Sequence, residues 1–161
     1  MIVVADTSVI LNLCRVQQEH LLQQLFKRVL LPAEVADEFT RLTRIHARFS
    51  GLVLPHWIEI SSRPQIFPPE VIQAQLDVGE SAAITLCLHQ KADVLLIDEK
   101  AGREVATRLG VRTVGIAGVL VAAKNWKLIP SVKDLLERLE REANFWIASD
   151  LRLRILQLAG E

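Results

Sequence analysis

Residues 79–126 read GESAAITLCLHQKADVLLIDEKAGREVATRLGVRTVGIAGVLVAAKNW, and their apolar residues recur alternately at helical spacing and in short runs. The pattern predicts helices over 79–90, 100–109 and 118–126, separated by strands over 94–97 and 111–116. Alternating strands and helices are typical of parallel sheets, in which right-handed helical crossovers join neighbouring strands. This stretch therefore predicts an α/β fold with a mainly parallel sheet.

The residues before this stretch extend the same alternation. Short apolar runs predict three further strands, over 2–5, 29–31 and 57–60. Helical patterns predict helices from about 8 to 16, over 20–27, and from Pro32 to a break near Ser50. The sheet is therefore expected to contain about five strands.

Two more segments complete the organisation of the chain. Residues 61–69 contain half of the prolines and are interpreted as a surface connection. Helices over 131–142 and about 149–158 predict a C-terminal helical extension. We expect one three-layer domain over residues 1–161, with helices on both faces of the sheet and the extension beginning near residue 131.

Composition limits the class of protein. The 161 residues are 50% hydrophobic, which is enough for one substantial core, and the formal net charge is zero. The charge balance therefore provides no global attraction to nucleic acid or to an anionic membrane. The apolar runs are too short to span a bilayer and residues 1–6 do not resemble a signal peptide, so we expect a soluble, cytoplasmic protein. Cys14 and Cys87 lack metal-type spacing and are interpreted as buried thiols.

Two aspartates follow apolar strands directly. Asp6 comes after the strand over 2–5, and Asp98 comes after the strand over 94–97. Ligands of open parallel sheets bind beyond the carboxyl ends of the strands, near the point where the strand order reverses. A single aspartate at such a position could equally be a helix cap or a turn residue. The repetition of the arrangement favours a functional role.

Glu80 lies on the apolar side of its predicted helix. On a helical wheel it falls between Ile84 and Cys87, whereas Ser81 and Thr85 fall on the opposite side, where we expect solvent. Burial of an unpaired carboxylate is costly. Glu80 is therefore interpreted as a ligand directed at the end of the sheet; the alternative is a first-turn glutamate that caps the helix and interacts with its dipole.

The same test separates three acids on the helix that begins at Pro32. Asp37 lies with Arg41 on a charged face, and Glu34 lies at the margin of that face. Glu38 falls within the apolar stripe. Two helix carboxylates and two strand-end carboxylates could therefore converge on one site.

Carboxylates at close range repel one another, and divalent cations remove this conflict. Oxygen ligands favour Mg²⁺ or Mn²⁺ over zinc, and the chain offers no paired histidines or cysteines for a competing site. A pair of such ions activates water and stabilises the leaving oxygen in phosphodiester cleavage. This chemistry is that of a nuclease.

These motifs, in this order, resemble the PIN-domain family, which includes many prokaryotic VapC-like toxin ribonucleases. The resemblance covers nearly the whole chain, and its motifs are VVADTS (3–8), LPAEVADEF (31–39), LDVGESAA (76–83) and LLIDE (95–99). The branch in which Gly-Glu begins the central helix and GIAGVL (115–120) follows the last strand is the most similar. The chain departs from the family in two respects, the first of which is that many members have an aspartate where Glu80 stands.

The resemblance implies that Asp6, Glu38, Glu80 and Asp98 are catalytic and hold one or two Mg²⁺ or Mn²⁺ ions for RNA hydrolysis. It further implies that Ser8 supports these ligands from behind. An additional acid found beyond the last catalytic aspartate in the family has no clear counterpart, although Glu99 could replace it. A toxin of this family would also have a cognate antitoxin as its partner.

The RNA substrate needs positive charge near the acids. Lys100 and Arg103, just after Asp98, are the nearest candidates, although such residues more often belong to a solvated helix face. The apolar residues of the last helix predict docking on their own domain or, alternatively, a homodimer contact.

Three readings of the function remain open at the level of sequence. The first is a metal-dependent ribonuclease, and the second is an inert PIN-like module that binds RNA or protein. The third is a phosphatase of the haloacid-dehalogenase type, which is less favoured because Ser8 stands where such enzymes place a second aspartate.

Overall fold

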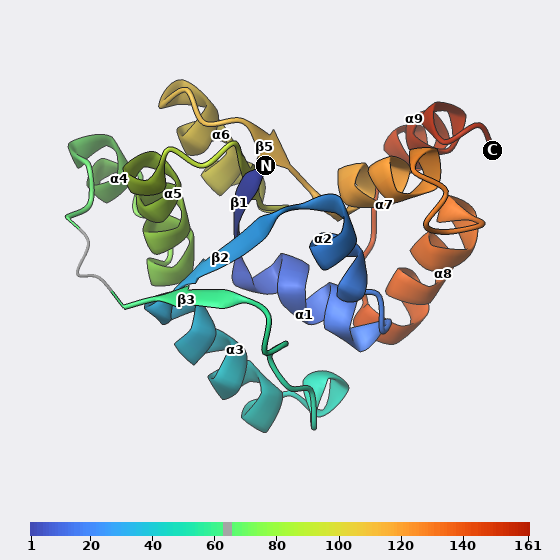
Figure 1. Cartoon of the computed structure of the whole chain (residues 1–161), viewed down its shortest axis with the longest axis horizontal. Helices are drawn as coiled ribbons and strands as arrows, with labels where there is room; N and C mark the ends of the chain where they lie inside the picture. Colours follow the sequence, from blue (N-terminus) through green and yellow to red (C-terminus); the bar gives the residue numbers. More distant parts are fainter. Residues whose placement is uncertain (63–65) are drawn as a thin grey trace.

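The central sheet is parallel throughout. In the computed structural model, which describes residues 1–62 and 66–161, five strands pair in the order β3-β2-β1-β4-β5 (Figure 1). The strands are β1 (Ile2–Ala5), β2 (Arg28–Pro32), β3 (Glu59–Ser61), β4 (Val94–Leu96) and β5 (Thr113–Val114). All four pairings are parallel, which confirms the predicted α/β class.

The strand order reverses between β1 and β4. The chain first builds β1, β2 and β3 toward one edge, and then returns to place β4 and β5 on the other side of β1. In the register of this pairing, Ala5 lies opposite Leu96. The carboxyl ends of β1 and β4 therefore meet at the switch point, which is where open parallel sheets bind ligands.

Helices cover both faces of the sheet. They are α1 (Thr7–Arg15), α2 (His20–Leu25), α3 (Ala33–Ile45), α4 (Pro69–Gln73), α5 (Val78–Gln90), α6 (Lys100–Arg108), α7 (Ile116–Asn125), α8 (Val132–Ala143) and α9 (Ser149–Leu158), with a short 3-10 helix at Ala47–Phe49. Figure 1 shows α4, α5 and α6 on one side of the strands and α1, α2, α7 and α8 on the other. The predicted three-layer arrangement is therefore confirmed.

The strands are apolar on both faces because both faces are covered. Val3, Val4, Leu95 and Leu96 are fully buried, and so are the largest side chains of α1 that face them. Parallel strands buried on both sides appear in sequence as continuous apolar runs, not as an alternating pattern. This explains why IVVA and VLL read so clearly as strands.

Some element boundaries differ from those predicted. The strand expected over 111–116 contains only Thr113 and Val114, and α7 begins at Ile116 because Gly115 occupies its N-cap position. The prediction of a surface connection over 61–69 falls partly on residues 63–65, which lie outside the described residues. The short helix α4 was not predicted; Pro69 occupies its first turn, a position that suits proline.

Helix α5 has no solvent-facing side from Gly79 to Cys87, contrary to the prediction. Ser81 and Thr85 were expected to face solvent, but they are only 5% and 1% exposed. The helix contacts strands β1, β2 and β4 as well as α3, α4 and α6. The Thr85 hydroxyl donates a hydrogen bond of 2.7 Å to the Ser81 carbonyl, which satisfies a polar group that water cannot reach.

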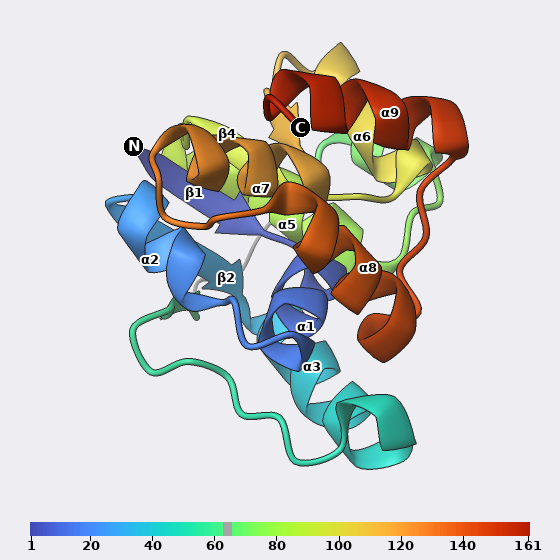
Figure 2. The same cartoon turned by 90° about the vertical axis from the view of Figure 1, so that its right-hand side faces the viewer.

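The two C-terminal helices pack on the domain. Helix α8 contacts α1 and α7, and α9 contacts α7, as Figure 2 shows from the side. Ile155 of α9 is buried, whereas Leu153 and Leu158 are mostly exposed. None of the helices described is both long enough and apolar enough to cross a membrane.

Candidate active site

Acidic side chains gather around one cavity at the carboxyl end of β1. The cavity has a volume of about 330 Å³ and is lined by Asp6, Glu38, Asp77, Glu80 and Glu99, among others. These acids come from the end of β1, from α3, from the start of α5 and from the residue before α6. The fold therefore brings together carboxylates that are up to 93 positions apart in the sequence.

Asp6 lies deepest in this group. It is 4% exposed, and its backbone N–H donates a hydrogen bond of 2.9 Å to the Leu96 carbonyl, which ties it to β4. Burial, together with the negative charges of Asp77, Glu80 and Glu38, raises the pKa of Asp6 to about 7, although a hydrogen bond from the Thr7 backbone acts in the opposite direction. Asp6 is therefore a carboxylate in an environment that disfavours its charge.

Glu80 is buried in the first turn of α5, with 6% of its surface exposed. Burial raises its pKa, and the nearby carboxylate of Asp77 adds to the effect. The cap of this helix is Asp77, whose Oδ1 accepts a hydrogen bond of 2.7 Å from the Glu80 N–H. Because Asp77 caps the helix, the alternative interpretation of Glu80 as the capping residue is not supported.

Glu38 is held at the cavity by its neighbours. The Thr7 hydroxyl donates a hydrogen bond of 2.5 Å to Glu38 Oε2, and Arg41 lies 3.8 Å from Oε1. Gly79 faces the same carboxylate so closely that a Cβ at this position would lie 2.7 Å from Oε2. Of the residues on α3, Glu38 therefore lines the acidic cavity, whereas Asp37 is exposed and lines a neighbouring cavity.

Asp98 does not line the cavity that the other three predicted acids share. It lies instead at the edge of two adjacent cavities, one against α6 and one against the segment before α9. Its Oδ1 accepts a hydrogen bond of 3.1 Å from the Ile116 N–H, while Oδ2 is buried without a hydrogen-bond partner among the described residues. Burial raises the pKa of Asp98 to about 6, and the guanidinium of Arg103 opposes this shift.

Two residues beside Asp6 behave differently from the prediction. Ser8 lines the cavity, but its buried hydroxyl has no hydrogen-bond partner among the described residues. The hydrogen bond to a site carboxylate comes from Thr7, for which the sequence predicts no role in the site. The position of Thr7, directly after the first aspartate, was the available signal.

Asp77 is an acid of the cavity that the sequence does not predict, although it stands in the motif around Gly79 and Glu80. An aspartate three residues before a helical glutamate is an ordinary N-cap residue, so its position alone indicates no second role. In the structure it caps α5 and also faces the cavity, where it raises the pKa values of Asp6 and Glu80.

Two glycines leave room for predicted site carboxylates. Besides Gly79 at Glu38, Gly115 is so close to Asp98 that a Cβ would lie 2.4 Å from Oδ1. On α6, Gly102 leaves room for Ile97 instead, because a Cβ would lie 2.5 Å from Ile97 but at an ordinary contact distance of 3.6 Å from the Glu80 carboxyl carbon. These glycines are required by space rather than by backbone conformation; Gly115, for example, has a φ of −92°.

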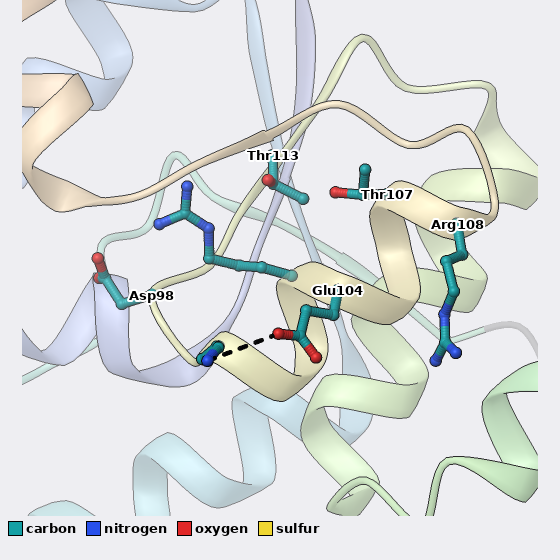
Figure 3. A pocket seen from close by; sticks show the side chains of 7 residues that line it. Asp98, Glu104, Thr107, Arg108 and Thr113 are labelled. Atoms are coloured by element: carbon teal, nitrogen blue, oxygen red, sulfur yellow. Dashed lines mark ion pairs between the residues drawn. The ribbon is translucent and has the colours of Figure 1, made fainter.

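The two predicted RNA-contacting residues line a cavity of about 570 Å³ against α6. Figure 3 shows Asp98 at one end of this cavity and Arg108 at the other. Lys100 is 3.9 Å from Glu104 on the same helix, so its charge is partly neutralised. Arg103 has no carboxylate within 4 Å among the described side chains.

Comparison with known proteins identifies the family of the chain. A family model described as PIN domain matches residues 2–161, nearly the entire chain. The chain belongs to the PIN-domain family. Predicted membership is therefore confirmed, and PIN domains are typically metal-dependent nucleases that act on RNA.

Among solved structures, this PIN domain is similar to a PilT N-terminus domain protein from the hyperthermophilic archaeon Sulfolobus solfataricus P2. The two share 17% sequence identity with a TM-score of 0.50, over 76% of this chain and 93% of that one. At this identity the similarity concerns the fold alone. No curated protein matches the chain.

The acids of this PIN domain suit a hard divalent cation. Within residues 1–62 and 66–161, no three His, Cys, Asp or Glu side chains already stand in the arrangement of a metal site. The donor set is nevertheless all oxygen, and burial and mutual repulsion raise the pKa values of Asp6 and Glu80. A cation would remove both penalties, so the residues present fit Mg²⁺ or Mn²⁺.

Proposed function

We propose that this PIN domain is a metal-dependent endoribonuclease whose ion is held by Asp6, Glu38 and Glu80, with Asp98 at the edge of the site. The observation that carries the proposal is the shared cavity, because three elements deliver three partly or fully buried carboxylates to one space. Folding alone would select against such crowding, since each buried charge costs free energy and repels the others. A function that uses the charges accounts for their presence.

Each side chain of the site has a role that follows from its position. Asp6, Glu80 and Glu38 would hold one or two Mg²⁺ or Mn²⁺ ions, which would supply positive charge and activate water for attack on the phosphodiester. The Thr7 hydroxyl fixes Glu38 in its ligating position. Asp98, whose Oδ2 is buried without a hydrogen-bond partner among the described residues, would add negative charge beside this site from the adjacent cavities.

The basic side chains near Asp98 bind the phosphates of the RNA backbone. Arg103 has no carboxylate within 4 Å among the described side chains, and Lys100 lines the same cavity along α6. Both belong to the helix that follows Asp98 directly, so phosphates bound there lie next to the acids.

We further propose, from the VapC-like motifs, that the ribonuclease is the cytoplasmic toxin of a toxin–antitoxin pair. Induced expression of the wild-type chain would then arrest bacterial growth, whereas expression of the Asp6→Asn variant would not. Equal growth of both strains at equal protein levels would contradict the toxin role.

The proposed activity is tested with a mixed pool of single-stranded and structured RNA. Purified protein is incubated with the pool in Mg²⁺, in Mn²⁺ or in EDTA, and the products are resolved on denaturing gels. We expect cleavage only with metal, and a loss of about 100-fold or more in Asp6→Asn and Glu38→Gln. Asp37→Asn, which changes an exposed acid next to Glu38, is the matched control and should keep the wild-type rate.

Two results would overturn the assignment. Cleavage that persists in EDTA, or full activity in Asp6→Asn, would show that the acids do not act through a metal. Binding of RNA without cleavage in every metal would support the alternative of an inert PIN-like module.

A further inference from the structure

A third cavity joins Asp98 to an exposed aromatic segment. It has a volume of about 480 Å³ and lies between the start of α7 and the loop that connects α8 to α9. It is lined by Asp98 after β4, by Arg103 on α6 and by Gly115 at the N-cap of α7, and on the other side by Trp146 and Leu151 from the C-terminal segment. The cavity therefore places an aromatic surface beside a site acid and a cation.

The indole of Trp146 is both exposed and held in place. It is 68% exposed, and its Nε1 donates a hydrogen bond of 2.9 Å to Asn144 Oδ1. Asn144 ends α8 with a φ of 53°, in the left-handed conformation that asparagine tolerates. An indole fixed at one edge presents its ring at little further entropic cost, which suits it to stacking.

Arg103 supplies the positive charge of this cavity. Its Nη1 lies 3.6 Å from the position that a Cβ of Gly115 would occupy, the same position that approaches Asp98. The guanidinium therefore lies near Asp98 but forms no ion pair with it within 4 Å among the described side chains, so its donors are available to a phosphate.

We propose that this cavity is a nucleotide subsite, in which a base of single-stranded RNA stacks on Trp146 while the adjoining phosphate binds Arg103. The proposal rests on the ribonuclease function, because it places the nucleotide next to the acids that would cut the strand. Single-stranded nucleic acids are bound by this combination of an aromatic platform and a basic side chain. An RNA strand bound in this cavity would pass next to Asp98.

RNA is favoured over a protein partner by the composition of the cavity. A purely apolar contact with a second chain would bury the exposed Arg103 guanidinium away from water, which is costly without a matched partner. Trp126 is equally exposed, at 69%, but it lines none of the cavities that contain site residues among those described. Trp126 therefore serves as an internal control.

The test measures RNA binding without cleavage. Fluorescence anisotropy of a labelled ten-nucleotide oligoadenylate is recorded in EDTA for the wild-type chain, Trp146→Ala, Trp146→Phe and Trp126→Ala. Stacking of one base is worth about 1–3 kcal/mol, so Trp146→Ala should weaken binding by about 5-fold to 150-fold. Trp146→Phe should keep most of the affinity, and Trp126→Ala should stay within about twofold of the wild-type value.

The phosphate contact has its own readout. Loss of one phosphate contact lowers the slope of log affinity against log salt by about 0.7 for a single strand. Arg103→Gln should show this change, whereas Arg112→Gln, at an exposed position outside these cavities, should not.

The outcomes separate the subsite from the ribonuclease function. Wild-type affinity in Trp146→Ala, or an equal loss in Trp126→Ala, overturns the subsite even if the protein cleaves RNA. A change of mass by light scattering in Trp146→Ala, with unchanged RNA binding, overturns it as well and identifies an interface between copies. Loss of binding in Trp146→Ala supports the subsite even if no metal elicits cleavage, a result that would defeat only the nuclease. Circular dichroism confirms that each variant is folded.

Discussion

At the scale of single residues, the site depends on glycines, which have no side chain, as well as on carboxylates. Gly79 leaves space for Glu38, and Gly115 leaves space for Asp98. The acids could be proposed from strand ends and helical phase, because these features are local in sequence. The glycine contacts could not, since each joins elements that meet only in the folded chain.

The space at Gly115 leads to a prediction for the variant Gly115→Ala. The added Cβ would lie 2.4 Å from Asp98 Oδ1, so the carboxylate must move, whereas the backbone φ of −92° is one that alanine adopts without strain. We expect RNA cleavage to fall by about 10-fold or more, with a drop in the melting temperature of a few degrees at most. A wild-type cleavage rate would show that the position of Asp98 does not matter.

The hydrogen bond from Thr7 leads to a second prediction. Thr7→Val keeps the shape of the side chain but removes the donor to Glu38 Oε2. Loss of such a supporting hydrogen bond typically lowers metal affinity by about 10-fold to 100-fold. The Mn²⁺ concentration for half-maximal cleavage should rise by that factor, saturating Mn²⁺ should restore the rate, and Thr7→Ser should behave as wild type. An unchanged Mn²⁺ requirement in Thr7→Val would contradict the role.

At the scale of elements, the regular alternation of strands and helices could be predicted because each element carries its own period of apolar residues. The burial of α5 could not be predicted in the same way. Its polar residues Ser81 and Thr85 are buried in a helix that contacts α3, α4 and α6. These contacts depend on distant segments of the chain, so the sequence of α5 alone does not reveal them. The predicted burial of Glu80 is therefore confirmed. Its reason differs from the predicted one, because α5 is buried on all sides at this point and not on one apolar face alone.

Helix α8 depends on a distant cap. The Glu161 carboxylate accepts hydrogen bonds from the Val132 N–H at 2.6 Å, from the Lys133 N–H at 3.3 Å and from the Ser131 hydroxyl at 3.0 Å. Burial opposes the charge, but these hydrogen bonds together with Lys124 lower the pKa of Glu161.

We therefore expect Glu161→Ala to lower the free energy of unfolding by about 1 kcal/mol at neutral pH. The difference from wild type should shrink as the pH falls below the ordinary glutamate pKa, because protonation removes the charged acceptor. Urea denaturation at pH 7 and pH 3.5 measures it. An equal difference at both pH values would show that the charge contributes nothing.

At the scale of the whole molecule, the acids reduce the stability of the metal-free fold. The pKa of Asp6 is raised to about 7 and that of Asp98 to about 6, so the folded chain keeps protons that the unfolded chain loses near pH 4. The free energy of unfolding therefore falls as the pH rises from about 4 to 7. The slope is about 1.4 kcal/mol per pH unit for each such group.

This balance predicts that the protein in EDTA is less stable at pH 8 than at pH 5.5, and that saturating Mg²⁺ or Mn²⁺ reverses the order. Asp6→Asn should be more stable than wild type at pH 8 in EDTA, because it removes a buried charge, while being inactive. Asp150→Asn, an exposed change on α9, provides the control. If the wild-type protein in EDTA is more stable at pH 8 than at pH 5.5, the result contradicts the account.

The central claim is that the cavity at the carboxyl end of β1 holds a divalent ion, and anomalous diffraction from a crystal grown in Mn²⁺ tests it most directly. The account predicts a manganese peak in contact with the carboxylates of Asp6 and Glu80, and no such peak in Asp6→Asn crystals grown in the same way. A cavity without manganese, in crystals whose Asp6, Glu38 and Glu80 side chains are well ordered and accessible to the solution, would contradict it.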